Sequence, residues 1–278
     1  MLINGIENNQ IAATDRGLAY GDGLFSTIKV EHGAVQLWDY HLARFKRGAE
    51  RLFFPVVDWF LLEQEVMTLA KTLSGNSLAV IKVILTRGSG GRGYSSRGCD
   101  TPLRIVSCHP FPDFYLSWQQ QGINIELCQQ RLASSGQLAG IKTLNRLEQI
   151  LIKHELETLQ ALEGIVCDND GYVVEACSAN VFVYLNDQWL TPKLETSGVA
   201  GVKRQQILDA AQQSGIAIKE THLRVDELFN AQGLCITNAL MGIVAVRQLQ
   251  DHVYPKEGLV AVLTLQNLLN QREQLDVL

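Results

Sequence analysis

The sequence contains no uninterrupted apolar stretch of the about 18 residues that a membrane-spanning helix needs. Its first residues, Met1 to Gly5, also lack the basic and apolar regions of a secretory signal. We therefore expect a protein without membrane association, located in the cytoplasm.

Paired cysteines are missing as well. The six cysteines are scattered along 278 residues and none forms a Cys-x-x-Cys pair. A disulfide framework is typical of much shorter secreted chains, and zinc sites use closely spaced ligands. We expect reduced thiols, mostly buried, and no metal.

The chain has no long run of lysine or arginine, and its net charge is −5. This charge pattern argues against nucleic acid as a partner. There is no Gly-x-Ser-x-Gly elbow, the six histidines are isolated, and Gly88 to Gly93 lacks the Gly-Lys-Ser/Thr ending of a phosphate-binding loop. Acid–base chemistry must therefore come from lysine, carboxylates or a cofactor.

Periodicity indicates an α+β fold in two domains. Residues 24–30 alternate apolar and polar side chains, which is a strand period, whereas residues 39–52 repeat apolar positions as a helix does. The run His109-Pro110-Phe111-Pro112 interrupts regular structure. We predict a smaller N-terminal α/β domain over residues 1–110, a linker over 111–119 and a larger C-terminal domain over 120–278.

Further elements follow from the same patterns. We predict a helix over 59–72 and strands over 35–37, 78–86 and 103–107 in the first half. In the second half we predict helices over 144–159, 201–213 and 259–270, the first capped by Thr143. The predicted strands there cover 123–128, 164–167, 172–175, 180–185, 216–220 and 234–237.

Two charged residues stand in apolar surroundings. Lys142 lies in a short apolar segment before a predicted helix, and Glu175 ends the apolar strand Tyr172-Val173-Val174. Taken alone, either side chain could simply be solvated, since strand ends often expose a glutamate and lone lysines are mostly on the surface.

Their neighbours, however, form longer motifs. Gly140-Ile141-Lys142 with Asn145, followed by Glu175-Ala176-Cys177-Ser178-Ala179-Asn180, resembles the two halves of the class-IV aminotransferase signature. Tyr20 to Thr27 is similar to that family's N-terminal strand motif, and His41-Leu42-Ala43-Arg44-Phe45 to its His-x-x-Arg-Leu helix, with Phe45 replacing leucine. The resemblance covers essentially the whole chain and implies the two-domain fold-type IV architecture, pyridoxal 5′-phosphate (PLP) as cofactor and a homodimer.

The resemblance also implies roles for single residues. Lys142 would carry PLP as a Schiff base and then act as the catalytic base, and Glu175 would face the pyridine nitrogen. For the phosphate group, the implied ligands are Arg44, the helix start at Gly201-Val202, and the turn at Asn238-Ala239, which could also be an ordinary strand-end turn.

Within the family, Arg87 to Tyr94 looks like the Arg-Gly-x-Gly-Gly-Arg-Gly-Tyr run of bacterial aminodeoxychorismate lyases. That likeness implies conversion of 4-amino-4-deoxychorismate to 4-aminobenzoate and pyruvate, a step toward folate. Arg92 and Tyr94, with Ser26, are the candidate substrate residues, and Arg97 is a weaker candidate. The alternatives are an aminotransferase acting on D-alanine or branched-chain amino acids, and a PLP-binding protein without activity.

Overall fold

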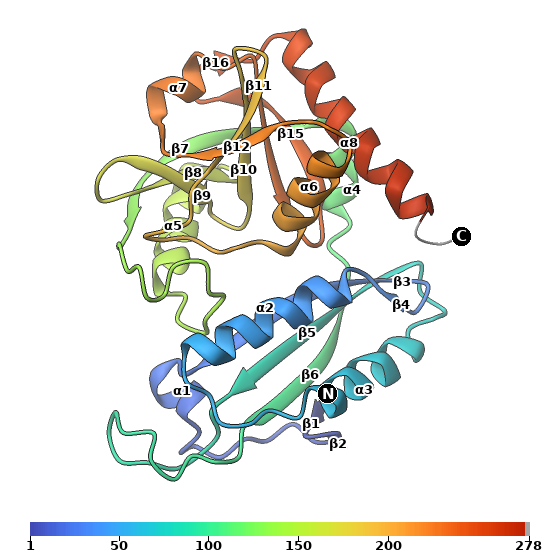
Figure 1. Ribbon diagram of the computed structural model, residues 1–278, viewed down its shortest axis with the longest axis vertical. Helices are drawn as coiled ribbons and strands as arrows, with labels where there is room; N and C mark the ends of the chain where they lie inside the picture. Colours follow the sequence, from blue (N-terminus) through green and yellow to red (C-terminus); the bar gives the residue numbers. More distant parts are fainter. Residues whose placement is uncertain (276–278) are drawn as a thin grey trace. The chain divides into compact units, whose positions relative to one another are not determined.

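The structure is a computed structural model that describes residues 1–275, with side chains up to Leu269. The chain divides into two compact units (Figure 1). The first unit comprises residues 1–112 together with 141–146, and the second comprises 113–140 and 147–278. The short segment 141–146, which includes Lys142, therefore belongs to the first unit although its flanking residues belong to the second.

The first unit is built on an antiparallel sheet with strand order β2-β1-β6-β5-β3-β4. Helices α2 and α3 pack against it, and a short helix α1 precedes β3. The strands are β1 Leu2–Ile3, β2 Ile6–Glu7, β3 Gly23–Glu31, β4 Ala34–Val35, β5 Leu78–Thr86 and β6 Leu103–Pro110, and the helices are α1 Arg16–Tyr20, α2 Trp38–Arg51 and α3 Trp59–Lys71.

Strand β3 shows the alternation that its sequence predicts. Leu24, Ser26, Ile28 and Val30 are buried, whereas the residues between them are only half-buried. The apolar members of the buried set join one core with Phe45 and other side chains of α2 and α3. Burying one face of a strand fixes its register, because a shift by one residue would turn every side chain to the opposite face.

The second unit contains a mixed sheet with strand order β12-β11-β10-β14-β15-β7-β8-β9-β13, and β16 pairs with β15. The pairs β11–β12, β15–β7 and β7–β8 are parallel, and the others are antiparallel. The strands are β7 Ile123–Leu132, β8 Gly164–Asp168, β9 Tyr172–Ala176, β10 Asn180–Leu185, β11 Gln188–Pro192, β12 Ile218–Thr221, β13 Leu223–Arg224, β14 Gly233–Asn238, β15 Gly242–Leu249 and β16 His252–Val253.

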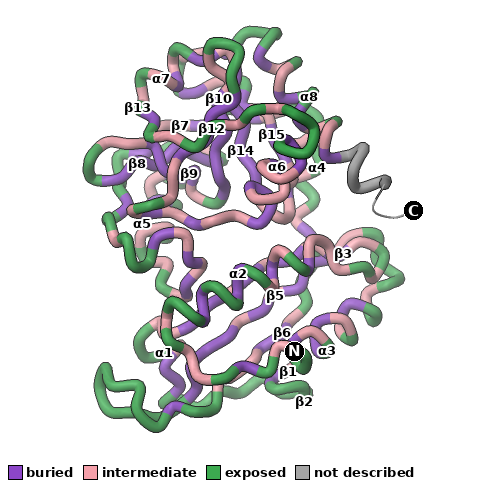
Figure 2. Tube along the Cα trace, viewed as in Figure 1, coloured by how far each residue is buried: buried purple, intermediate pink, exposed green. Residues whose placement is uncertain are grey.

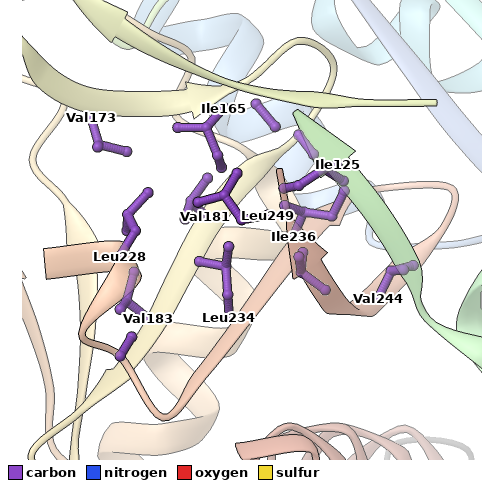
Figure 3. Close-up of a cluster of buried hydrophobic side chains, with 14 of the residues drawn as sticks. Ile125, Ile165, Val173, Val181, Val183, Leu228, Leu234, Ile236, Val244 and Leu249 are labelled. Atoms are coloured by element: carbon purple, nitrogen blue, oxygen red, sulfur yellow. The ribbon is translucent and has the colours of Figure 1, made fainter. Parts of the chain in front are cut away.

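This sheet carries two apolar layers. Val181 and Val183 of β10 point into one cluster with Leu234 and Ile236 of β14 (Figure 3), whereas Phe182 between them packs into another cluster formed with α6 and α8. Strands covered on both faces read as continuous apolar runs, as β10 does.

The helices of the second unit are α4 Phe114–Gln121, α5 Leu147–Thr158, α6 Val202–Gln213, α7 Val225–Phe229 and α8 Lys256–Leu275.

Figure 2 shows that burial is concentrated along the strands of each unit, whereas the loop after β5 is exposed. In residues 1–275 no helix combines the length and the apolar character that crossing a bilayer requires. The same residues contain no group of three histidine, cysteine or acidic side chains able to hold a metal ion.

Four local expectations need correction. The helix predicted from residue 144 begins at Leu147, and Thr143 does not cap it. Instead, Thr143 forms a bridge with Leu24, and its hydroxyl accepts a hydrogen bond from Arg146 (2.9 Å), because this segment runs extended along β3. The strand predicted over 103–107 continues as β6 to Pro110, so His109 and Pro110 do not interrupt it. The segment 111–119, expected to be a linker, contains the start of α4.

Candidate active site

Lys142 is placed by strand β3. The backbone N–H of Phe25 donates to the Lys142 carbonyl (3.1 Å), and the N–H of Leu144 donates to the Gly23 carbonyl (2.9 Å). The Lys142 Nζ lies 4.5 Å from the centroid of the Phe25 ring, on whose face an ammonium group is attracted electrostatically. A half-buried amine is thus held by a short extended segment rather than by a flexible loop.

Arg44 belongs to the same unit and lies on the buried side of α2. Its side chain is 9% exposed, and its Nη2 donates to Ser26 Oγ at 2.6 Å. Burial lowers the pKa of Arg44 to about 10, with a further contribution from the charge of Arg47. The guanidinium therefore stays protonated at neutral pH.

One packing contact relates Arg44 to the lysine segment. Gly48 lies four residues after Arg44, so the two occupy one face of α2. A Cβ at Gly48 would lie 3.4 Å from Cγ2 of Ile141, the residue before Lys142. The helix face that carries Arg44 therefore packs against the segment that carries Lys142.

Glu175 lies in the second unit on β9 and is 5% exposed. Its Oε2 accepts a hydrogen bond from the backbone N–H of Val199 (2.8 Å). Gly198, at a φ of +83°, allows the chain to pass close to this carboxylate, since a Cβ there would lie 3.3 Å from Oε2. The carboxylate is consequently buried and fixed in orientation.

The start of α6 lies beside the same segment. Gly201 is the N-cap of α6 and has no side chain to cap it, and Val202 is the first helical residue. Asn180 donates from Nδ2 to the Val199 carbonyl (2.8 Å), and a Cβ at residue 201 would collide with the amide oxygen of Asn180. Glycine at this position thus leaves room for the asparagine that holds the turn.

Asn238 closes β14 and shapes the turn that follows it. Its Oδ1 accepts from the N–H groups of Leu240 and Met241, both at 2.9 Å, and its Nδ2 donates to the Ser178 carbonyl (3.2 Å). The side chain of Asn238 is therefore engaged in holding the backbone of the turn, which includes Ala239.

The glycine-rich loop after β5 carries the candidate substrate residues on its surface. Arg92 is exposed, and Tyr94 is 91% exposed, with its ring centroid 5.7 Å from that of Tyr20. Lys142, Arg44 and Ser26 all lie in the first unit, where Arg44 is hydrogen bonded to Ser26, and Glu175, Gly201 and Val202 lie in the second.

Sequence reasoning missed the residue that anchors this loop. Arg16 is 5% exposed and donates to the carbonyls of Gly93 (3.0 Å), Tyr94 (3.3 Å) and Ser95 (3.1 Å). Its Nε also donates to Asp22 (2.9 Å), which receives a second bond from Arg87 (2.8 Å). Because the partners lie up to 79 residues apart, no local sequence pattern indicates the contact.

Asp22 forms ion pairs with both Arg16 and Arg87, and their charges keep its carboxyl ionised. Burial alone would raise the pKa of this carboxyl, but the hydrogen bonds and charges of Arg87 and Arg16 outweigh burial and hold the pKa below its ordinary value of 3.8. Asp22 is therefore ionised throughout the neutral range.

Comparison with known proteins defines the family. Residues 23–249 match the family described as amino-transferase class IV, and the chain belongs to that family. It is similar to an aminodeoxychorismate lyase of Vibrio harveyi, with 34% identity over 88% of this chain and 89% of that protein. A putative branched-chain-amino-acid aminotransferase of Methanocaldococcus jannaschii is 29% identical over 88% of this chain and 84% of that protein.

Among solved structures, 4-amino-4-deoxychorismate lyase from Pseudomonas aeruginosa superposes with a TM-score of 0.90, at 37% identity, over 97% of this chain and 98% of that chain. The chain therefore has the two-domain α+β fold that its motifs predict.

Proposed function

We propose that this chain is a PLP-dependent lyase that converts 4-amino-4-deoxychorismate to 4-aminobenzoate and pyruvate. The observation that carries the proposal is similarity of at least 34% identity to two lyases over nearly the whole chain, including a solved structure of that name. Aminotransferase activity on D-alanine or branched-chain amino acids is the alternative, supported by the more distant relatives.

The side chains present suit the cofactor. An aldehyde needs an amine, a phosphate needs a cation and backbone donors, and a protonated pyridine nitrogen needs an anion. Lys142 offers the amine, Arg44 a buried guanidinium that stays charged, and Glu175 a buried carboxylate. We propose that Gly201 and Val202 at the start of α6, and the turn at Asn238-Ala239, add backbone donors for the phosphate.

When bound, PLP supplies an electron sink that stabilises negative charge next to the substrate amine. In the proposed reaction, the Lys142 amine would hold the cofactor and would serve as the base that removes the proton from C4 of the substrate. Glu175 would keep the pyridine nitrogen of the cofactor protonated. Loss of the pyruvate unit from C3, with one proton returned to it, balances the reaction without an oxidant or a second keto acid, and the ring becomes aromatic.

The substrate carries two carboxylates, and cationic side chains are the natural partners for them. We propose Arg92 as the first of these, with Tyr94 beside it on the loop anchored by Arg16. Ser26, the third candidate, is completely buried and hydrogen bonded to α2, which suits a supporting role better than direct substrate contact.

We also propose a cytoplasmic homodimer. Leu147, Ile150 and Leu151 of α5 are 68, 62 and 56% exposed, so this helix presents an apolar face that a second copy could cover. All six cysteines are free thiols, which suits a reducing compartment.

The deciding experiment mixes the purified protein, PLP and aminodeoxychorismate without any keto acid, and follows 4-aminobenzoate fluorescence. Product formed under these conditions supports the lyase, whereas turnover that requires an added keto acid would establish the aminotransferase instead. Lys142→Ala should abolish activity, and Lys153→Ala, which removes an exposed lysine on α5, should leave it unchanged.

A further inference from the structure

Ser26 is a polar residue on the covered face of a strand. It stands between Leu24 and Ile28, both buried in the core of the first unit, and is itself 0% exposed. Burying a hydroxyl group costs free energy unless it is hydrogen bonded, so its partners indicate why a serine occupies this position.

Two partners of the hydroxyl come from one turn of α2. Arg44 Nη2 donates to Ser26 Oγ at 2.6 Å, and Nδ1 of His41 lies 2.6 Å from the same oxygen. His41 and Arg44 are three residues apart and so share a face of the helix. His41 is also 0% exposed.

The donors and acceptors that Arg44, Ser26 and His41 offer limit how protons can be arranged in these two hydrogen bonds. Since Arg44 can only donate, the Ser26 oxygen accepts from it and its single proton is free to be given to His41. His41 Nδ1 can accept that proton in the neutral tautomer that carries its own proton on Nε2. This tautomer adds no positive charge next to the buried guanidinium, where like charges repel strongly.

This arrangement fixes the orientation of Arg44 without neutralising it. A guanidinium is planar, so holding one Nη atom restricts the whole fork of donors. A carboxylate in the place of Ser26 would cancel the positive charge, whereas a hydroxyl leaves the guanidinium charged.

We propose that Ser26 and His41 are positioning residues that orient the Arg44 guanidinium toward the phosphate of PLP. The proposal rests on the proposed function, in which Arg44 binds that phosphate. It predicts a selective defect, because misorienting Arg44 weakens the hold on a phosphorylated cofactor and leaves the attachment of the aldehyde to Lys142 intact.

The test compares PLP with pyridoxal, which has the aldehyde and the ring but no phosphate. Ser26→Ala should weaken PLP binding by the full-length protein about tenfold, the scale of one lost charge-assisted hydrogen bond. Pyridoxal affinity should change less than about twofold. Affinities come from titrating the cofactor-free protein and following cofactor absorbance.

Histidine variants provide the second arm. His41→Leu should reproduce the PLP-selective defect, and His41→Asn, whose Oδ1 can replace Nδ1 as acceptor, should restore affinity to near that of the wild type. Ser107→Ala is the matched control, since the half-buried Ser107 makes an analogous bond to Nε2 of the exposed His109 (2.9 Å) on β6 of the same unit.

Three outcomes would overturn the proposal: unchanged PLP affinity in Ser26→Ala, equal losses for PLP and pyridoxal, or no difference between His41→Asn and His41→Leu. If Ser26→Ala fails to fold, the histidine pair decides alone. A wild-type protein that does not bind PLP would instead refute the proposed function, so the two failures are distinguishable.

Discussion

Replacing Arg16 by lysine should loosen the glycine-rich loop without touching Lys142 or Glu175. Arg16 joins three loop carbonyls to Asp22, and its guanidinium also lies 4.9 Å from the Tyr20 ring centroid. A lysine ammonium can keep the contact with Asp22 and one carbonyl, but its compact head cannot span all of them. Two loop hydrogen bonds are then lost.

The magnitude follows from those two bonds. At about 1 kcal/mol net for each, the free energy of unfolding should fall by about 2 kcal/mol. Because the loop presents Arg92 and Tyr94, we expect KM for aminodeoxychorismate to rise about tenfold, with kcat changed less than about threefold. Urea denaturation and steady-state kinetics measure the two effects.

Arg87→Lys is the matched control. Arg87 binds the same Asp22 oxygen, but its remaining donors reach the carbonyls of Leu52 (2.6 Å) and Phe53 (2.8 Å) at the end of α2. By the same count this variant loses one carbonyl bond, so the free energy of unfolding should fall by about 1 kcal/mol, while KM stays within about twofold of the wild type. A KM equally raised in both variants, or unchanged in Arg16→Lys, would refute a specific role for Arg16 in holding the loop.

The same contact should depend on pH in one direction. Because the pKa of Asp22 is lower in the folded protein than its ordinary value of 3.8, its ion pairs stabilise the fold above that pH. That stability should disappear as the pH falls below about 4, and Asp22→Asn should remove the share of the acid-dependent unfolding free energy that comes from this group.

Three further variants test other parts of the site. Glu175→Gln keeps an acceptor for the Val199 N–H but loses the negative charge, so kcat should fall about a hundredfold while PLP stays bound. Unchanged turnover would refute the proposed role of the Glu175 carboxylate at the pyridine nitrogen. In Gly201→Ala the new Cβ would collide with Asn180, so PLP binding should weaken about tenfold. In the control Gly136→Ala the new Cβ makes only an ordinary contact, and PLP affinity should not change. Equal PLP affinities of the two variants would show that glycine is not required at position 201. Ile150→Glu should yield monomers by light scattering if α5 forms the dimer contact, and a persisting dimer would place the contact elsewhere.

The regular elements were largely predictable because burial acts on local patterns. Strand β3 alternates in sequence and in burial, and β10 reads as a continuous apolar run because both of its faces are covered. Helix α5 was predicted three residues too long at its start, since Leu144 continues the apolar spacing but its N–H is engaged by Gly23 of β3. Tertiary pairing overrode helix propensity there.

The supporting contacts of the candidate site were not predictable in the same way. Motif resemblance singled out Lys142, Glu175 and Arg44, whose positions in the reaction stay a prediction. It gave no indication that Arg16 anchors the loop or that His41 and Arg44 share one hydroxyl. Such contacts join residues 15 to 79 positions apart, and only the folded backbone determines which of them meet.

Neighbouring positions on β3 serve opposite sides of the strand. Phe25 lies beneath the Lys142 amine, and the adjacent Ser26 contacts Arg44 through the covered face. Deleting a single residue at the start of β3 would exchange these faces, turning a phenyl ring toward the guanidinium and a hydroxyl toward the amine. The pairing of Leu24 with Leu85 on β5 therefore fixes the register on which two chemically different contacts depend. One is the contact of Phe25 with the Lys142 amine, and the other is the hydrogen bond of Ser26 with Arg44.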